Sequence, residues 1–207
     1  MHDSVSRSTL AILVRRLGQL YLGLVLFGLS SAMMVRSVLG LNPWDVFHQG
    51  LDERTPLSFG TVVIISGAFV LLLWIPLRQR PGLGTVSNIF VIGLAADLGL
   101  WLIPGVETLA GRAAMLAGGI LLNGLATSAY IGAGFGPGPR DGLMTGLASR
   151  TGWPIRRVRT GIELAVLAAG WLLGGTVGIG TVLYALAIGP IVHLTLPWFT
   201  FRVATPA

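Results

Sequence analysis

Asp97 is the residue of this sequence whose position most strongly suggests chemistry. It lies within an apolar segment, where an ionised side chain is costly, and this makes it a candidate proton carrier or ion ligand. His193 follows it by 96 residues and occupies the equivalent position of an internal repeat, so the two side chains are candidates for one shared binding site. The alternative is a neutral Asp97 hydrogen-bonded to Asn88 or Asn123, with His193 near the membrane edge.

Two similar motifs each place an aspartate in the first turn of a short helix. In the first motif Asn42 suits the N-cap, Pro43 suits the first helical position, and Asp45 lies beside the free amides of the helix start. Pro139 and Asp141 occupy the same positions in the second motif. In the structural interpretation, both aspartates only stabilise the starts of short helices that are re-entrant or lie at the membrane interface.

The functional alternative treats the two motifs as a symmetric pair of gates. An ion pair closes each gate, Asp45 with Arg54 on one side and Asp141 with Arg150 on the other. A helix N-terminus that already carries an aspartate favours a cation or a proton over an anion as the bound species.

The other ionisable residues have ordinary structural explanations. Arg159 precedes Glu163 by one helical turn, a spacing typical of a salt bridge. Together with Arg156 and Arg157, Arg159 forms a cluster typical of an anchor for anionic lipid headgroups. His48 lies on the first short helix, where we expect no role in binding.

Residue types that many enzymes and metal sites need are missing from the sequence. It has no cysteine, which excludes disulfides, thiolate metal ligands and a cysteine nucleophile. It has no lysine, so it lacks the ending of a phosphate-binding Walker loop, and it has no His-Glu-x-x-His or Gly-x-Ser-x-Gly motif. We therefore expect no catalytic residues, no metal and no cofactor, and we do not expect an enzyme.

The composition indicates an integral membrane protein. Of 207 residues, 53% are hydrophobic and 11% are charged, less than half the charged share of a typical soluble domain. Apolar runs of about 17–25 residues cross the bilayer as helices. We predict one all-α membrane domain over residues 1–207 with six transmembrane helices, at 17–35, 61–77, 85–103, 113–131, 160–177 and 181–201.

The arginines predict the orientation of these helices. With the N-terminus inside, eleven of the fourteen basic residues fall on the inner side, including Arg7 near the start and Arg202 near the end. Both termini are therefore expected in the cytoplasm. The arginines lie between apolar runs and form no patch with aromatic residues, so the net charge of +6 does not indicate a nucleic-acid partner.

An internal repeat organises the chain. Residues 40–100 align without gaps on residues 136–196 at a constant offset of 96. The matches include distinctive residue types: Pro43 on Pro139, Asp45 on Asp141, Arg54 on Arg150, and Thr85 on Thr181. Each repeat, at about 17–103 and 113–201, contains three predicted spans, so the second is inverted relative to the first. Inverted-topology repeats are frequent in secondary transporters.

Three segments carry a family resemblance: GLNPWDVFHQGL (40–51), GLGT (82–85, with Asn88 following) and GPGPRDG (136–142). They resemble the YczE/YyaS/YitT family of bacterial membrane proteins, and the YczE branch most closely. The resemblance implies a multi-pass protein of the bacterial inner membrane. It implies no substrate.

Two functions are compatible with these observations. The first is a small secondary transporter or permease, with proton coupling through Asp97 and His193, for an unidentified small molecule or ion. The alternative is an accessory or scaffold protein of the membrane that acts through a partner without transport. In either case the expected surroundings are the lipid bilayer, and six short spans are compatible with a homodimer.

Overall fold

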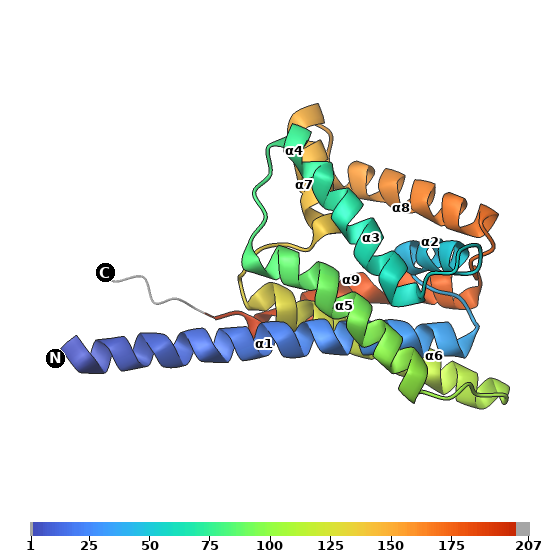
Figure 1. Ribbon diagram of the computed structural model, residues 1–207, viewed down its shortest axis with the longest axis horizontal. Helices are drawn as coiled ribbons and strands as arrows, with labels where there is room; N and C mark the ends of the chain where they lie inside the picture. The colour runs from blue at the N-terminus through green and yellow to red at the C-terminus, as the bar shows by residue number, and fades with distance from the viewer. Residues whose placement is uncertain (1, 202–207) are drawn as a thin grey trace.

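The computed structural model describes the backbone of residues 2–201 and the side chains of residues 10–201 (Figure 1). Arg202 and the side chain of Arg7, both assigned above to the inner side, lie outside these limits. Within them the chain is helical and contains no strand. The helices are α1 (His2–Ser37), α2 (Pro43–Asp52), α3 (Phe59–Leu72), α4 (Trp74–Leu77), α5 (Leu83–Leu102), α6 (Leu109–Gly132), α7 (Pro139–Thr151), α8 (Ile155–Leu172) and α9 (Ile179–Phe199).

Five of the described helical segments are long and apolar enough to cross a membrane, and they overlap five of the six predicted spans. They are Leu10–Ser37, Phe59–Leu77, Leu83–Leu102, Leu109–Gly132 and Ile179–Phe199. The segment Phe59–Leu77 comprises α3 and α4.

The predicted span over 160–177 is the exception. The helix in that region, α8, begins at Ile155 and ends at Leu172, and its first half carries three arginines and Glu163. It is not one of the five apolar segments. The predicted range lies too far along the chain because apolar residues continue past Leu172 into the following turn, as far as Val177.

The 96-residue offset recurs in the helix boundaries. The first residues of α2, α3 and α5 are 43, 59 and 83, and those of α7, α8 and α9 are 139, 155 and 179. Local start signals explain the coincidence. Pro43 and Pro139 each occupy a first helical turn, and the Thr85 and Thr181 side chains each accept a hydrogen bond from the backbone amide just before their helix.

The two halves bind each other through equivalent backbone contacts. The Gly84 amide donates to the Phe135 carbonyl at 2.8 Å, and the Gly180 amide donates to the Leu39 carbonyl at 2.8 Å. Donors and acceptors are both related by the 96-residue offset. Each half therefore supplies the acceptor for the helix start of the other.

Two apolar clusters show the same relation between the halves. One contains Leu20 and Leu24 of α1 with Tyr130 of α6. The other contains the residues at the equivalent positions, Leu116, Ile120 and Met34. In Figure 1, α1 and α6 lie along one edge of the molecule, with α5 crossing α1. The core is therefore shared between the halves and is not built separately within each.

Candidate functional site

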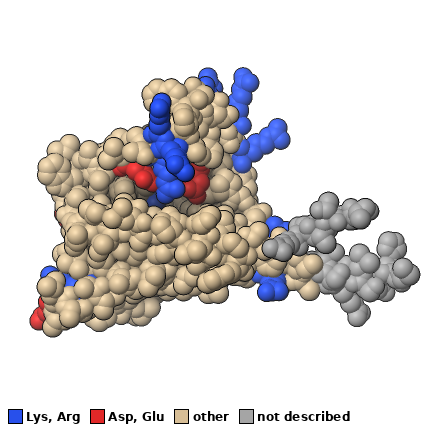
Figure 2. All heavy atoms as spheres, turned by 180° about the vertical axis from the view of Figure 1, so that it is seen from behind, with Lys and Arg blue, Asp and Glu red and all other residues tan. Residues whose placement is uncertain are grey.

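A cavity of about 400 Å³ lies between the two halves of the chain. Arg140, Asp141, Arg159 and Glu163 belong to its wall, although most of the remaining wall is apolar. Figure 2 shows basic and acidic side chains gathered in a hollow on a face that is otherwise largely uncharged. A volume of this order is typical of sites for small molecules.

Residues at equivalent positions of the two halves face the cavity together. The pairs include Asn42 with Gly138, Pro43 with Pro139, and Trp44 with Arg140. The members of the last pair touch, because the Arg140 guanidinium lies over the Trp44 ring at 4.8 Å from its centroid. This contact joins equivalent positions of the two halves, and we refer to it as the centre of the repeat.

The acidic groups in the cavity wall already have donors. The Tyr130 hydroxyl donates to Asp141 Oδ2 at 3.1 Å. Arg159 Nε donates to Glu163 Oε1 at 2.9 Å, which confirms the salt bridge expected from their spacing.

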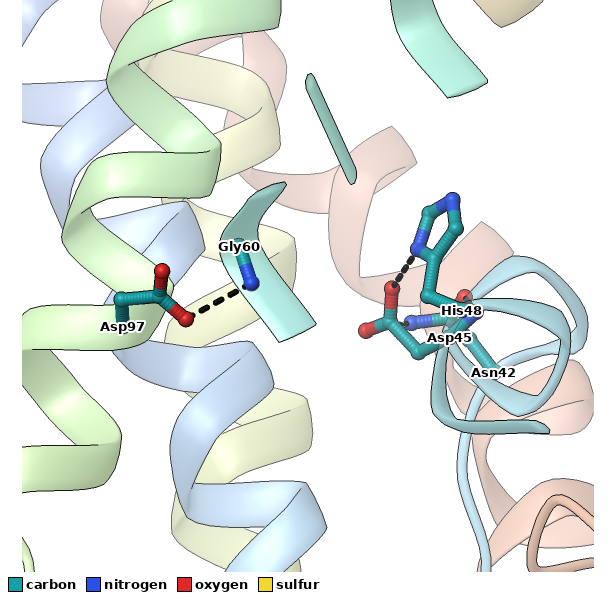
Figure 3. Close-up of polar contacts among 5 residues, drawn as sticks. All are labelled: Asn42, Asp45, His48, Gly60 and Asp97. Atoms are coloured by element: carbon teal, nitrogen blue, oxygen red, sulfur yellow. Dashed lines mark hydrogen bonds and ion pairs between the residues drawn. The ribbon is translucent and has the colours of Figure 1, made fainter. Parts of the chain in front are cut away.

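A buried polar cluster adjoins the cavity at the start of α2 (Figure 3). The Asp45 amide donates to Asn42 Oδ1 at 3.0 Å, which confirms the predicted N-cap. Asn42 Nδ2 donates to Asp45 Oδ2 at 2.6 Å, and His48 Nδ1 lies 3.3 Å from Asp45 Oδ1. All three side chains are at most 3% exposed. Asp45 therefore does more than cap a helix, because it also binds a buried histidine.

His48 is the residue of this cluster that sequence reasoning missed. It follows Asp45 by three residues on α2, a spacing that places the two side chains on one helix face, and this was the available signal. Burial lowers the pKa of His48 below its ordinary value of 6.5, and the positive charge of Arg140 adds to this effect against the opposing influence of Asp45. Burial raises the pKa of Asp45, but His48 and Arg140 outweigh it and hold that pKa below its ordinary value.

Acidification is expected to destabilise the protein through His48. Because folding lowers the pKa of His48 below its ordinary value of 6.5, stability falls as the pH drops below about 6.5, by up to about 1.4 kcal/mol per pH unit. The unfolding temperature of the purified protein, measured from about pH 7.5 to about pH 5, should fall less steeply in His48→Gln. Equal slopes in wild type and His48→Gln contradict the prediction.

Asp97 binds the start of α3 (Figure 3). Its carboxylate accepts hydrogen bonds from the Gly60 amide at 2.7 Å and from the Ser58 hydroxyl at 2.5 Å. Asp97 therefore does not bind Asn88 or Asn123, the partners expected for its neutral form. The carboxylate instead joins α5 to the N-terminus of α3, where a negative charge is favourable.

The other predicted binding residues lie in separate places. Asn88 and His193 line the cavity, whereas Asp97 does not, so Asp97 and His193 do not share one site. Asn123 is fully buried, where its Nδ2 donates to Ser30 Oγ at 2.8 Å and its Oδ1 accepts from the Tyr184 hydroxyl at 3.0 Å.

The predicted ion pairs of the two gates do not form among the described residues. Arg54 Nε instead donates to the Leu173 carbonyl at 2.6 Å, and Arg150 Nη1 donates to the Pro76 carbonyl at 2.6 Å. Each arginine binds carbonyls at the end of a helix from the other half, because the last carbonyls of a helix lack partners within it. Sequence spacing did not reveal this exchange.

Comparison with known proteins relates the chain to bacterial proteins. The model of a family described as "Family of unknown function (DUF6198)" matches residues 14–197. The chain is 39% identical to an uncharacterized protein of Haemophilus influenzae, over 86% of this chain and 81% of the relative. It is 34% identical to the uncharacterized membrane protein YczE of Bacillus subtilis (86% and 83%) and 26% identical to YyaS of the same organism (85% and 90%). No solved structure matches.

Proposed function

This chain belongs to the DUF6198 family and is similar to the membrane protein YczE, and from this we propose that it is a small secondary transporter of the bacterial inner membrane. In this proposal α8 is the sixth span and both termini lie in the cytoplasm. The two halves are then inverted repeats, and the protein moves its ligand without transforming it. The observation that carries the proposal is the central cavity, whose wall contains equivalent residues of both halves.

The cavity extends toward one end of the repeat. Beyond its centre it follows the C-terminal parts of α6 and α9, where Thr127, Ile131 and Val192 line it. The wall does not include their equivalents in the first half, which are Ser31, Val35 and Ala96. If the two inverted halves exchange conformations, the cavity closes beside the residues of the second half and opens beside their equivalents in the first half. This exchange is the basis of alternating access.

Side-specific labelling of single cysteines tests this proposal. The chain contains no cysteine, so an introduced thiol is labelled without background. Thr127→Cys should react with a membrane-impermeant maleimide from the cytoplasmic face, in inside-out vesicles. Ser31→Cys, at the equivalent and now buried position, should react from the periplasmic face when the alternative state is populated. The labelling rate of Ser31→Cys should be reduced in proportion to the fraction of molecules in that state.

Ser128→Cys serves as the matched control. This position follows Thr127 directly, is fully buried, and does not line the cavity, so it should stay unlabelled from either face. If Ser31→Cys is equally inert in native membranes while Thr127→Cys reacts, alternating access is wrong. That result favours the accessory or scaffold protein, which needs no second state.

A further inference from the structure

Arg140 carries a charge that the rest of the cavity does not pair. Among the described residues it has no hydrogen bond and no carboxylate oxygen within 4.0 Å. Its contact is with the face of the Trp44 ring. Stacking uses the flat face of a guanidinium and leaves the N–H groups at its edge free to donate in plane. Arg140 is half-buried in the cavity wall, where an oxygen atom of a bound molecule can accept hydrogen bonds from these donors.

The carboxylates near Arg140 are committed to other donors. Asp45 binds Asn42 and His48, Asp141 binds Tyr130, and Glu163 binds Arg159. The negative charge of Asp45 acts on Arg140 from beyond ion-pair distance. A second donor lies close by, because the indole N–H of Trp44 is buried without an acceptor among the described residues. Two donors near the centre of the cavity, the Arg140 guanidinium and the Trp44 indole N–H, therefore lack an acceptor among the described residues.

The rest of the wall is suited to an apolar molecule. It is formed mostly by aromatic and branched aliphatic side chains, including Phe27, Ile92, Tyr130, Tyr184, Ile188 and Val192. A small number of polar groups in an apolar pocket fixes the orientation of a ligand. Here that polar group is a guanidinium, which matches the two oxygens of a carboxylate in a bidentate arrangement.

We propose that the cavity binds a small organic carboxylate with an apolar body, and that the Arg140 guanidinium binds its carboxylate. The proposal names the ligand class of the transporter proposed above and rests on it. It departs from the cation or proton that the two aspartate motifs favoured, because those aspartates are already hydrogen-bonded. The contact between positions 44 and 140 lies at the centre of the repeat, so the same arginine can meet the ligand in both states.

Four probes that share a benzyl group test the charge of the ligand. Phenylacetate, its neutral amide phenylacetamide, the cation 2-phenylethylamine and the zwitterion phenylalanine are each added to the purified protein, and the rise in unfolding temperature is measured against concentration. Phenylacetate should stabilise more than phenylacetamide, and 2-phenylethylamine should not stabilise. Comparison of phenylacetate with phenylalanine tells a simple carboxylate from an amino acid, because both carry the group that Arg140 binds.

Variants of Arg140 connect this preference to one side chain. Arg140→Gln should weaken the apparent affinity for phenylacetate about 10- to 100-fold, the effect of a lost charged hydrogen bond. Its affinity for phenylacetamide should change much less. Arg140→Lys keeps the charge without the bidentate fork, so its affinity for phenylacetate should lie between those of wild type and Arg140→Gln. Arg112→Gln removes an arginine that lies outside the cavity wall and should keep the preference for the acid.

The outcomes separate the ligand class from the transport function. Binding of 2-phenylethylamine in preference to phenylacetate, or no binding of any probe, overturns the carboxylate proposal. So does an Arg140→Gln variant that folds like wild type and keeps the preference for the acid over the amide. Labelling of Ser31→Cys from the periplasmic face is independent of these results, so transport can stand when the ligand class fails.

Discussion

Replacing Trp74 with alanine is expected to lower the free energy of unfolding by about 3–5 kcal/mol. Trp74 is 2% exposed at the start of α4 and packs against Gly142 of α7, where a Cβ atom at residue 142 would lie 1.9 Å from Trp74 Cζ2. Its indole nitrogen donates to the Pro139 carbonyl at 2.9 Å. The alanine variant leaves a large void and removes this hydrogen bond at the helix that carries Arg140 and Asp141.

Trp74→Phe separates the two contributions. It keeps an aromatic ring at position 74, loses the hydrogen bond to Pro139, and loses the outer indole atoms next to Gly142, so it should cost about 1–3 kcal/mol. Denaturant unfolding in detergent measures both variants. If Trp74→Ala is no less stable than Trp74→Phe, packing against Gly142 is not the main contribution of this side chain.

Replacing Gly60 with alanine is expected to destabilise the protein by about 3 kcal/mol or more. A Cβ atom at residue 60 would lie 2.1 Å from the Gly93 carbonyl oxygen and 2.6 Å from Asp97 Cγ. The obstacle is the backbone of α5, which cannot turn aside as a flexible side chain can. The variant must therefore separate α3 from α5 and stretch the hydrogen bonds of Asp97.

Gly161→Ala is the matched control for this substitution. A Cβ atom at residue 161 of α8 would meet no atom within 4 Å, and alanine favours a helix over glycine by up to about 1 kcal/mol. Its unfolding temperature should therefore equal or exceed that of wild type, while Gly60→Ala should yield little folded protein. A folded Gly60→Ala variant with wild-type stability shows that the crossing of α3 and α5 can widen without cost.

The elements of this fold could be predicted where the signal is local. Five spans follow from apolar length, and the starts of α2 and α7 follow from Pro43 and Pro139. The family resemblance is also confirmed, because the chain is 34% identical to YczE. The boundaries of α8 were wrong because apolarity does not stop where the helix does. The turn after Leu172 contains the apolar residues Leu173 and Val177.

The site was harder to predict because its contacts join residues far apart in the sequence. The aspartate motifs indicated the correct region, and Asn42 caps α2 as expected. The partners were not deducible from spacing: Arg54 and Arg150 bind carbonyls of the opposite half, and Asp97 binds Gly60. Arg140 belongs to the GPGPRDG motif, but no binding role was predicted for it, since its position depends on packing against Trp44 from the other repeat.

The exchange of contacts between halves also constrains how the chain is made. Synthesis starts at the N-terminus, so α2 and α5 leave the ribosome before their partners exist. The Gly84 amide cannot form its hydrogen bond until Phe135 has been synthesised, and the Arg54 guanidinium cannot do so until Leu173 has been synthesised. A nascent first half therefore lacks these hydrogen bonds, and it forms them only after translation has passed α8.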